Sequence, residues 1–310
     1  MTSDNGLSAS AVETIAGFTA GIVSTLAVHP LDVVKTRLQV DRTTTSRAGN
    51  SFRVARDIAR HEGGVRALYR GFTVNAVGNS ISWALYFLWY DKFKSALATY
   101  HGHPSASSQS LLGPTDYFLA SAGAGILTCC FTNPLWVIKT RMLSTAQHHP
   151  GAYPNMVYGL TSIIRTEGLR GLYRGLFPAI IGCSHGAVQF MALEQLKTWR
   201  SKSYAGTTSG GGAGGRRAFF SNADTLLMSA AAKVFAGSVT YPYQIVRTRL
   251  QTHDVDKTYR SAGDVVAQVW RKEGIGGFYK GLGPNLARIV PSTCVMFLVY
   301  ENTRYYLSQG

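Results

Sequence analysis

The chain has 310 residues and carries 31 Lys and Arg against 16 Asp and Glu, so its formal net charge is +15. A surplus of that size indicates an anionic partner, which is a nucleic acid, an anionic membrane surface or an anionic solute. Four scattered cysteines exclude a disulfide framework or a cysteine metal site, and we expect them to be free thiols in apolar surroundings.

The first eleven residues, MTSDNGLSASA, contain an aspartate and no arginine. They therefore predict neither a secretory signal nor an Arg-rich transit peptide. A long apolar segment over 11–37 predicts the first helix, in which Gly17 and Gly21 are spaced for close contact with another helix. Pro30 lies inside this helix and should bend it.

A short helix and a second long helix complete this first unit. Residues 52–61, FRVARDIARH, place apolar side chains on one side and arginines elsewhere, which predicts an amphipathic helix at a membrane surface. Residues 72–97 predict a second apolar helix. Mean hydropathy is only +0.02, and each long helix contains polar residues, so a soluble helical bundle is the alternative. The polar positions recur at matching places along the chain, which favours a shared polar interior.

The same pattern returns twice more, over 115–141, 158–166 and 176–199, and then over 224–249, 261–271 and 283–307. We therefore divide the chain into a tail (1–10), three repeats (11–98, 115–199 and 224–310) and two linking loops (99–114 and 200–223). The second loop contains SGGGAGGRR, which predicts a flexible linker. It follows no strand and opens no helix, so it does not indicate a phosphate-binding loop.

Three sequence motifs recur in the same order in each repeat. The first reads HPLDVVKTRLQ, NPLWVIKTRM and YPYQIVRTRLQ, with its proline at positions 30, 134 and 242. The second reads HEGGVRALYRG, TEGLRGLYRG and KEGIGGFYKG, and the third reads YDKFK, LEQLK and YENTR. This order, found three times, indicates a triplicated unit of roughly a hundred residues.

The triplicated Pro-x-Asp/Glu-x-x-Lys/Arg pattern, followed by the Glu-Gly and aromatic-basic-Gly motifs, resembles the mitochondrial carrier family from about residue 11 to 307. The resemblance implies an all-α membrane protein with six transmembrane helices in three pseudo-symmetric repeats, with short amphipathic helices on the matrix side. It also implies a multi-pass protein of the mitochondrial inner membrane that functions as a monomer. Both termini would face the intermembrane space, and one central site would work by alternating access.

Within the family, the chain resembles the branch that carries FAD and folate. Trp136 in NPLWVIKTR stands where the family usually has an acid. The other segments that carry this resemblance are GNSISWALYF (78–87), GCSHGAVQFMA (182–192), AAAKVFAGSVTYPYQ with Lys233, and WRKEGIGGFYKG (270–281). Carriers of pyrimidine nucleotides and of NAD share the Pro-Leu-Trp feature, so they are the alternatives.

A matrix gate is expected where the first motif places a base on each odd-numbered transmembrane helix: Lys35, Lys139 and Arg247. The family pattern pairs each base with an acid from a neighbouring helix. Here only Asp32 remains, and its expected partner is Lys139, because Trp136 and Gln244 cannot pair ionically. With one acid in this ring and three in the outer ring, we expect the empty chain to favour the state that is open to the matrix.

The third motif predicts an outer, cytoplasmic gate on the even-numbered helices. The expected cross-helix pairs are Asp91 with Lys197, Glu194 with Arg304, and Glu301 with Lys94.

The resemblance places the family's solute contacts at Gly78 and Asn79, at Gly182 and Cys183, and at Arg288. An ionisable residue inside a membrane helix is a functional candidate, which adds Lys233. Lys233 lies about four helical turns before Arg247 and so shares its face. Further candidates are Ser82, Trp83, Tyr86 and His185, which would stack on or bond to a flavin ring, and Lys35 and Arg247, which would meet an anion low in the cavity. A core role is the alternative for His185.

The second motif predicts an anion site where each even-numbered helix begins, because free backbone N–H groups and the helix dipole attract phosphate there. The resemblance implies bound cardiolipin at Arg70 and Gly71, Arg174 and Gly175, and Lys280 and Gly281.

These patterns together predict a transporter of FAD, or of a related flavin or folate. We expect no enzyme activity, no metal and no catalytic cofactor, because the sequence contains no paired carboxylates, nucleophile constellation or metal-ligand spacing. A pyrimidine nucleotide or NAD carrier is the alternative within transport. A basic helical repeat protein that binds nucleic acid is the alternative outside it, and we expect no nucleic-acid partner.

Overall fold

The structure is a computed structural model that describes residues 9–42, 50–101, 113–146, 149, 151–207, 222–253 and 255–309. Within these residues every regular element is helical. The expected tail up to residue 8, and the central parts of the two expected loops (102–112 and 208–221), lie outside the described residues.

The helices follow the order of the three repeats. The first repeat contains α1 (Ala9–Val40), α2 (Asn50–His61), the 3-10 helix η1 (Gly64–Tyr69) and α3 (Phe72–Tyr100). The second contains α4 (Pro114–Ser144), α5 (Met156–Leu172), α6 (Leu176–Gly182) and α7 (Ser184–Thr207). The third contains α8 (Asn222–Val239), α9 (Tyr241–Leu250), α10 (Val255–Thr258), α11 (Ala262–Gly277), α12 (Leu282–Ala287) and α13 (Ile289–Gln309).

Four helical segments are long and apolar enough to cross a membrane. They are Val12–Val40, Thr115–Ser144, Leu176–Arg200 and Leu282–Leu307, and Leu227–Val239 is a shorter apolar helix. With α3 and the α8–α9 segment, the described residues contain six long helical segments, two from each repeat. The expected all-α fold with three repeats and short intervening helices is confirmed.

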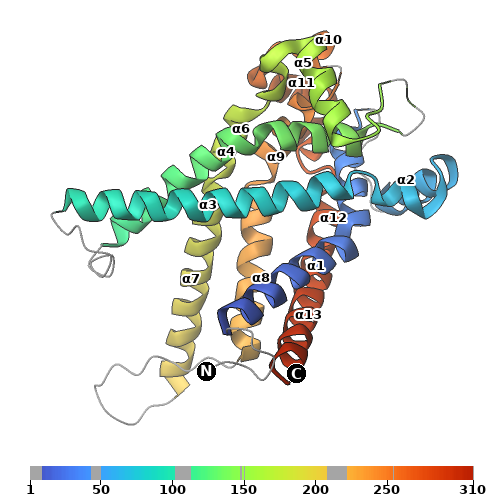
Figure 1. Ribbon diagram of the computed structural model, residues 1–310. Helices are drawn as coiled ribbons and strands as arrows, with labels where there is room; N and C mark the ends of the chain where they lie inside the picture. The colour runs from blue at the N-terminus through green and yellow to red at the C-terminus, as the bar shows by residue number, and fades with distance from the viewer. Residues whose placement is uncertain are drawn as a thin grey trace.

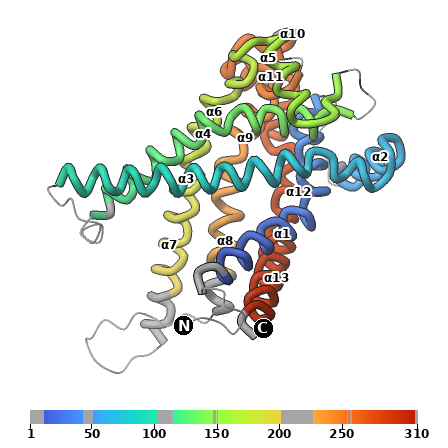
Figure 2. The backbone as a smooth tube through the Cα atoms, in the orientation of Figure 1, coloured from blue at the N-terminus to red at the C-terminus, as the bar shows by residue number. Residues whose placement is uncertain are grey.

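The long helices pack in pairs that join neighbouring repeats: α1 lies along α13, α3 along α4, and α7 along α8. The short helices α5, α10 and α11 gather at one end of the molecule, with α2 beside the start of α3 (Figure 1). We call this the short-helix end. Figure 2 shows the three pairs diverging away from it, with the α3–α4 pair running in a different direction from α7, α8 and α13.

The first helices of the three repeats converge at the short-helix end, where α1 contacts both α4 and α9. The structure is therefore closed at the short-helix end and open at the other. The contacts described below, which involve neutral side chains and a separate ring of arginines, hold this end together.

The prolines differ in whether they interrupt the long helices. The helices α1 and α4 continue through Pro30 and Pro134, whereas α8 and α9 are separated at Thr240, two residues before Pro242. Two further breaks separate α12 from α13 at Arg288, three residues before Pro291, and α6 from α7 at Cys183.

The glycine of the aromatic-basic-Gly motif is required by the backbone conformation at that position. Its glycines, Gly71, Gly175 and Gly281, precede α3, α6 and α12 with φ values of 73°, 72° and 80°. Residues with a Cβ rarely adopt this left-handed conformation. A Cβ at Gly71 would also lie 2.5 Å from Leu143 Cδ1. Each motif therefore turns the chain sharply from a short helix into the next long helix.

Three arginines, one from each repeat, link the repeats into a closed ring at the short-helix end. The Nε atom of Arg37 donates to the carbonyl of Leu143 at 2.8 Å, that of Arg141 to Gln251 at 3.2 Å, and that of Arg249 to Gln39 at 3.0 Å. Each accepting carbonyl lies at the C-terminal end of the next repeat's first helix, where a cation is favourable. We call these residues the arginine ring.

The glutamates of the Glu-Gly motif neutralise the arginine ring. Arg37 pairs with Glu62 at 2.7 Å, and Arg141 and Arg249 pair with Glu167 and Glu273 at 2.5 Å each. Burial disfavours the charged form of Glu273, but hydrogen bonds from Arg249 and Lys280 outweigh this effect and hold the pKa of Glu273 below its usual value. The two motifs are therefore coupled: one supplies the arginine and the other its counter-ion.

We predict that Arg249→Ala lowers the free energy of unfolding by about 3 kcal/mol, the lower end for breaking a buried ion pair. Arg249 is 1% exposed, and its loss would leave Glu273 with Lys280 alone. Thermal unfolding of the purified protein in detergent measures the change. The matched control is Arg271→Ala at an exposed position of α11, where we expect a change within about 0.5 kcal/mol. Equal losses in the two variants would contradict the role of the ring.

Candidate solute-binding site

A cavity of about 760 Å³ lies between α1, α3, α8 and the α12–α13 segment, with contributions from α7 and α9. Sites that enclose a small molecule typically have about 300–1,000 Å³, so this volume suits a solute of nucleotide size. Asp32 is the one acidic residue among the cavity's described lining residues.

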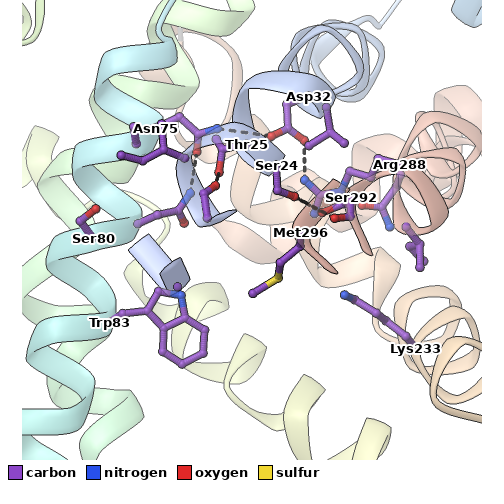
Figure 3. Close-up of a pocket in the computed structure, with 18 of the residues that line it drawn as sticks. Ser24, Thr25, Asp32, Asn75, Ser80, Trp83, Lys233, Arg288, Ser292 and Met296 are labelled. Atoms are coloured by element: carbon purple, nitrogen blue, oxygen red, sulfur yellow. Dashed lines mark hydrogen bonds and ion pairs between the residues drawn. The ribbon is translucent and has the colours of Figure 1, made fainter. Parts of the chain in front are cut away.

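The walls of the cavity combine an aromatic ring with a cation. Figure 3 shows Trp83 on α3 facing the open space from one side and Lys233 on α8 reaching toward it from the other. Trp83 is 62% exposed, so one face of its indole is available for stacking. Lys233 is exposed and lines the same space. The two side chains can therefore hold a flat ring and an anionic group at once.

The floor of the cavity is made by an ion pair between Asp32 on α1 and Arg288 at the break between α12 and α13 (Figure 3). The sequence predicted Lys139 as the partner of Asp32. The structure replaces it with Arg288, because α1 and α13 pack along each other and bring this guanidinium to the carboxylate.

The other bases of the expected matrix gate have neutral partners. Lys35 Nζ donates to Gln244 Oε1 at 3.0 Å and to Asn285 Oδ1 at 2.8 Å. Lys139 Nζ lies 4.6 Å from the centre of the Trp136 ring, and Arg247 Cζ lies 5.9 Å from it. The first of these cation–π contacts lies within α4, and the second joins α4 to α9 without a carboxylate. Trp136 and Gln244 stand where the family pattern has acids. They still contact bases of neighbouring repeats at the floor, but they contribute no negative charge.

The floor consequently has an excess of positive charge. Asp32 interacts electrostatically with Arg288, Lys139 and Lys35, and Lys35 in turn with Arg247. An anion that entered the cavity would meet these cations in surroundings where interactions between charges are stronger than in water.

One face of α1 lines the cavity with small and polar residues. The expectation that Gly17 and Gly21 allow close contact with another helix is therefore wrong. A Cβ placed on Gly17 or Gly21 would have no atom within 4 Å, so neither glycine serves close helix contact here. Both line the cavity and widen it. One turn further, Ser24 Oγ bonds the Ser292 carbonyl of α13 at 2.9 Å.

Of the residues expected at the site, Asn79, Trp83, His185, Lys233 and Arg288 line the cavity. His185 Nδ1 also lies 2.8 Å from Thr240 Oγ1, so it connects the starts of α7 and α9. Lys35 and Arg247 are not among the lining residues, although Lys35 bonds two that are, Gln244 and Asn285.

Five other expected residues contact protein instead. Gly78 is buried beside Leu135, Ser82 Oγ donates to the carbonyl of Gly78 at 2.7 Å, and Tyr86 Oη bonds Ser121 at 2.9 Å. Gly182 packs against Tyr243, where a Cβ would lie 2.6 Å from the ring. Cys183 Sγ lies 3.5 Å from Cys129 Sγ, and both thiols are free.

Several polar lining residues were missed as site residues, among them two asparagines. Asn75 and Asn285 are buried, line the cavity and bond Asp32 and Lys35 respectively. A buried amide at helical spacing from a cavity residue was the available signal, since Asn75 precedes Asn79 by one turn.

In the described part of the chain, two acids of the expected outer gate pair with bases of their own helices. Lys94 pairs with Asp91 at 3.8 Å and Lys197 with Glu194 at 2.9 Å, each within its own helix. The expected cross-helix pairs require the helix pairs to converge, and here they diverge (Figure 1).

The bases at the expected lipid sites face the protein. Arg70 donates to the carbonyls of Thr145 and Tyr153 at 2.6 and 3.2 Å. Arg174 lies 3.3 Å from Glu167, and Lys280 lies 2.5 Å from Glu273. Arg70 therefore joins the first repeat to the second, and Lys280 joins the third to the first through the Asp41 carbonyl at 3.0 Å, whereas the pair that Arg174 makes lies within the second repeat.

Comparison with known families decides the class of this protein. The family model described as mitochondrial carrier protein matches residues 8–101, 111–204 and 220–310. The chain belongs to the mitochondrial carrier family. Members of this family are multi-pass membrane transporters, so the long helices of this carrier cross a membrane.

Relatives of this carrier have several solutes in their names. The chain is 34% identical to the mitochondrial FAD carrier protein of Saccharomyces cerevisiae, with 95% of this chain and 96% of the relative covered. It is 35% identical to folate transporter 1, chloroplastic, of Arabidopsis thaliana, with 95% and 94% covered. It is 37% identical to nicotinamide adenine dinucleotide transporter 1, chloroplastic, of the same plant, with 94% and 90% covered.

We predict that the double variant Trp136→Asp with Gln244→Glu slows turnover, because it replaces neutral contacts at the floor by ion pairs that must break in every cycle. Each additional 1.4 kcal/mol would slow turnover about tenfold. Solute uptake into proteoliposomes measures the rate, and a higher melting temperature should accompany the slower transport. Trp136→Phe retains an aromatic face and serves as the control. Unchanged turnover and melting temperature in the double variant would show that these contacts do not limit transport.

Proposed function

We propose that this carrier moves FAD, or a related flavin or folate, across the mitochondrial inner membrane by alternating access. The observation that carries the proposal is the cavity itself, in which an exposed indole faces a lysine above a floor with excess positive charge. FAD combines a planar ring system with an anionic diphosphate, so both features of the site have a counterpart in the solute. Relatives named for FAD and for folate, aligned over nearly their whole length, support this choice.

Within this proposal, Lys233 and Arg288 bind the anionic part of the solute. Lys233 lies opposite Trp83, and Arg288 pairs with Asp32 at the floor of the same cavity (Figure 3). Hydrogen bonds between charged groups are short and about twice as strong as neutral ones. An anion at Arg288 would compete with Asp32, and the released carboxylate could then turn to Lys139. Solute binding would thereby break the ion pair between Asp32 and Arg288 at the floor.

A carrier of NAD is the second candidate, because two relatives of similar identity are named for that dinucleotide. The same cations suit its diphosphate. A basic nucleic-acid-binding protein is disfavoured, since the motif bases lie inside the molecule and contact protein groups.

Alternating access assigns a role to the charged residues at the divergent end. We propose that Asp91 with Lys197, Glu194 with Arg304, and Glu301 with Lys94 pair when the three helix pairs converge. Individual ion pairs facing water contribute only about 0–1 kcal/mol each. Differences of that size still shift an equilibrium between two states of similar free energy.

The proposal also includes an orientation of the protein in the membrane. The short-helix end would face the matrix, both termini would face the intermembrane space, and one chain would suffice for transport without a catalytic cofactor. Cardiolipin would bind where α3, α6 and α12 begin, through backbone N–H groups rather than through Arg70, Arg174 and Lys280. The left-handed Gly71, Gly175 and Gly281 expose those groups.

We predict that purified carrier in liposomes takes up labelled FAD, while ADP and small keto acids are not transported. Lys233→Ala should weaken FAD transport about tenfold, the effect of losing one charge-assisted bond of about 1.4 kcal/mol. Arg288→Ala should weaken it at least as much. Lys92→Ala, which removes a lysine from an exposed position of α3 outside the cavity, is the control. Transport of NAD or CTP without any response to FAD would reassign the solute.

We predict that cardiolipin raises the melting temperature of the detergent-solubilised protein, since a ligand that binds only the folded state stabilises it. Phosphatidylcholine at the same concentration is the control. Equal shifts with the two lipids would remove the argument for specific sites.

A further inference from the structure

A chain of amide groups leads from the floor of the cavity to its wall. Asn75 on α3 is 1% exposed and lies between Asp32 of the floor and Asn79 of the wall. Its amide nitrogen lies 3.4 Å from Asp32 Oδ2 and 3.4 Å from His29 Nδ1. The amide nitrogen of Asn79 donates to Asn75 Oδ1 at 3.2 Å.

The orientation of the Asn75 amide follows from its neighbours. The carboxylate of Asp32, held by Arg288, only accepts hydrogen bonds. His29 Nε2 lies 2.9 Å from the carbonyl of Arg70, which also only accepts, so a neutral imidazole carries its proton on Nε2 and leaves Nδ1 as an acceptor. Two acceptors therefore face one end of Asn75, and that end must be the amide nitrogen. The oxygen of Asn75 is directed the other way.

The fixed oxygen of Asn75 in turn orients Asn79. Because Asn75 Oδ1 accepts, Asn79 must turn its nitrogen toward it, and this uses one of the two amide hydrogens of Asn79. The oxygen and the second amide hydrogen of Asn79 remain for the cavity, which this residue lines. An adjacent acceptor and donor complement a ring edge on which an N–H stands next to a C=O.

We propose that Asn75 is a positioning residue that holds Asn79 ready to recognise the lactam edge of a planar heterocycle, the edge that flavin and pterin rings carry. Trp83, one helical turn beyond Asn79, lines the same wall and would stack on that ring. The ring edge would then be read on α3, while the anionic group is held by Lys233 and Arg288. This inference rests on the proposed function and assigns the chemistry by which the ring is chosen.

The test compares FAD with an FAD analogue methylated at N3 of the flavin, which lacks the N–H but retains the ring and the diphosphate. Equilibrium binding to the purified full-length protein is measured by calorimetry. Wild-type protein should bind the methylated analogue about five- to tenfold more weakly, the effect of losing one neutral hydrogen bond and leaving its partner unpaired.

Two variants separate recognition from structure. Asn79→Ala and Asn75→Ala should bring the affinity ratio of the two ligands close to one. Ser80→Ala, a neighbour that lines the cavity outside the amide chain, is the matched control and should retain the wild-type ratio. A merely structural role for Asn75 would weaken both ligands equally and leave their ratio unchanged.

The outcomes are distinct. A wild-type protein that binds FAD and its methylated analogue equally would overturn the inference and leave the proposed function intact. A ratio that persists in Asn79→Ala would show that the methyl group clashes elsewhere, and it would also overturn the inference. A wild-type protein that does not bind FAD at all would overturn the proposed function, and this inference with it.

Discussion

Four cations and one carboxylate lie at the floor of the cavity, and the proposed transport depends on that imbalance. Lys35, Lys139 and Arg288 interact with Asp32, Arg247 interacts with Lys35, and the partners that close the rest of the floor are amides and an indole ring. Cations that are held close together in partly desolvated surroundings repel each other. An anionic solute would relieve that repulsion, so the same residues that close the floor also attract what must open it.

The closed floor remains stable because its contacts are divided between two layers. The upper layer is the cavity floor, which uses weak and reversible contacts such as the one between Lys35 and Gln244. The lower layer is the arginine ring, in which Arg141 and Arg249 are buried and each is paired with a glutamate. Because these ion pairs lie within repeats and away from the cavity, opening the floor need not break them. A single layer with three strong pairs between repeats would resist opening.

The sequence alone was sufficient to predict the fold, because the three motifs have local causes. The prolines, the left-handed glycines and the Arg–Glu pairs recur at matching positions, and each acts on its own repeat or the next. The cavity was only partly predictable. Trp83 and Lys233 were identified because aromatic and charged residues are conspicuous in an apolar helix, whereas Asn75 and Gly21 were not, because their roles depend on which helices lie opposite.

Two errors have the same physical origin. The pairing of Asp32 with Arg288 rather than Lys139, and the exposure of Gly17 and Gly21 to the cavity, both follow from α1 packing along α13. That contact joins the first and last segments of the chain, and no local pattern of residues specifies it. The helix breaks at Cys183 and Arg288 were also missed, although Pro291, three residues after Arg288, was a signal for the second.

The central claim is that excess positive charge in the cavity selects the anionic part of the solute. The most direct measurement compares the binding of FAD and of riboflavin, which shares the flavin ring but has no phosphate, by calorimetry at low and high salt. The account predicts that FAD binds at least about tenfold more tightly at low salt, and that added salt reduces this difference by screening the cations. Equal affinity for the two compounds, independent of salt, would contradict it.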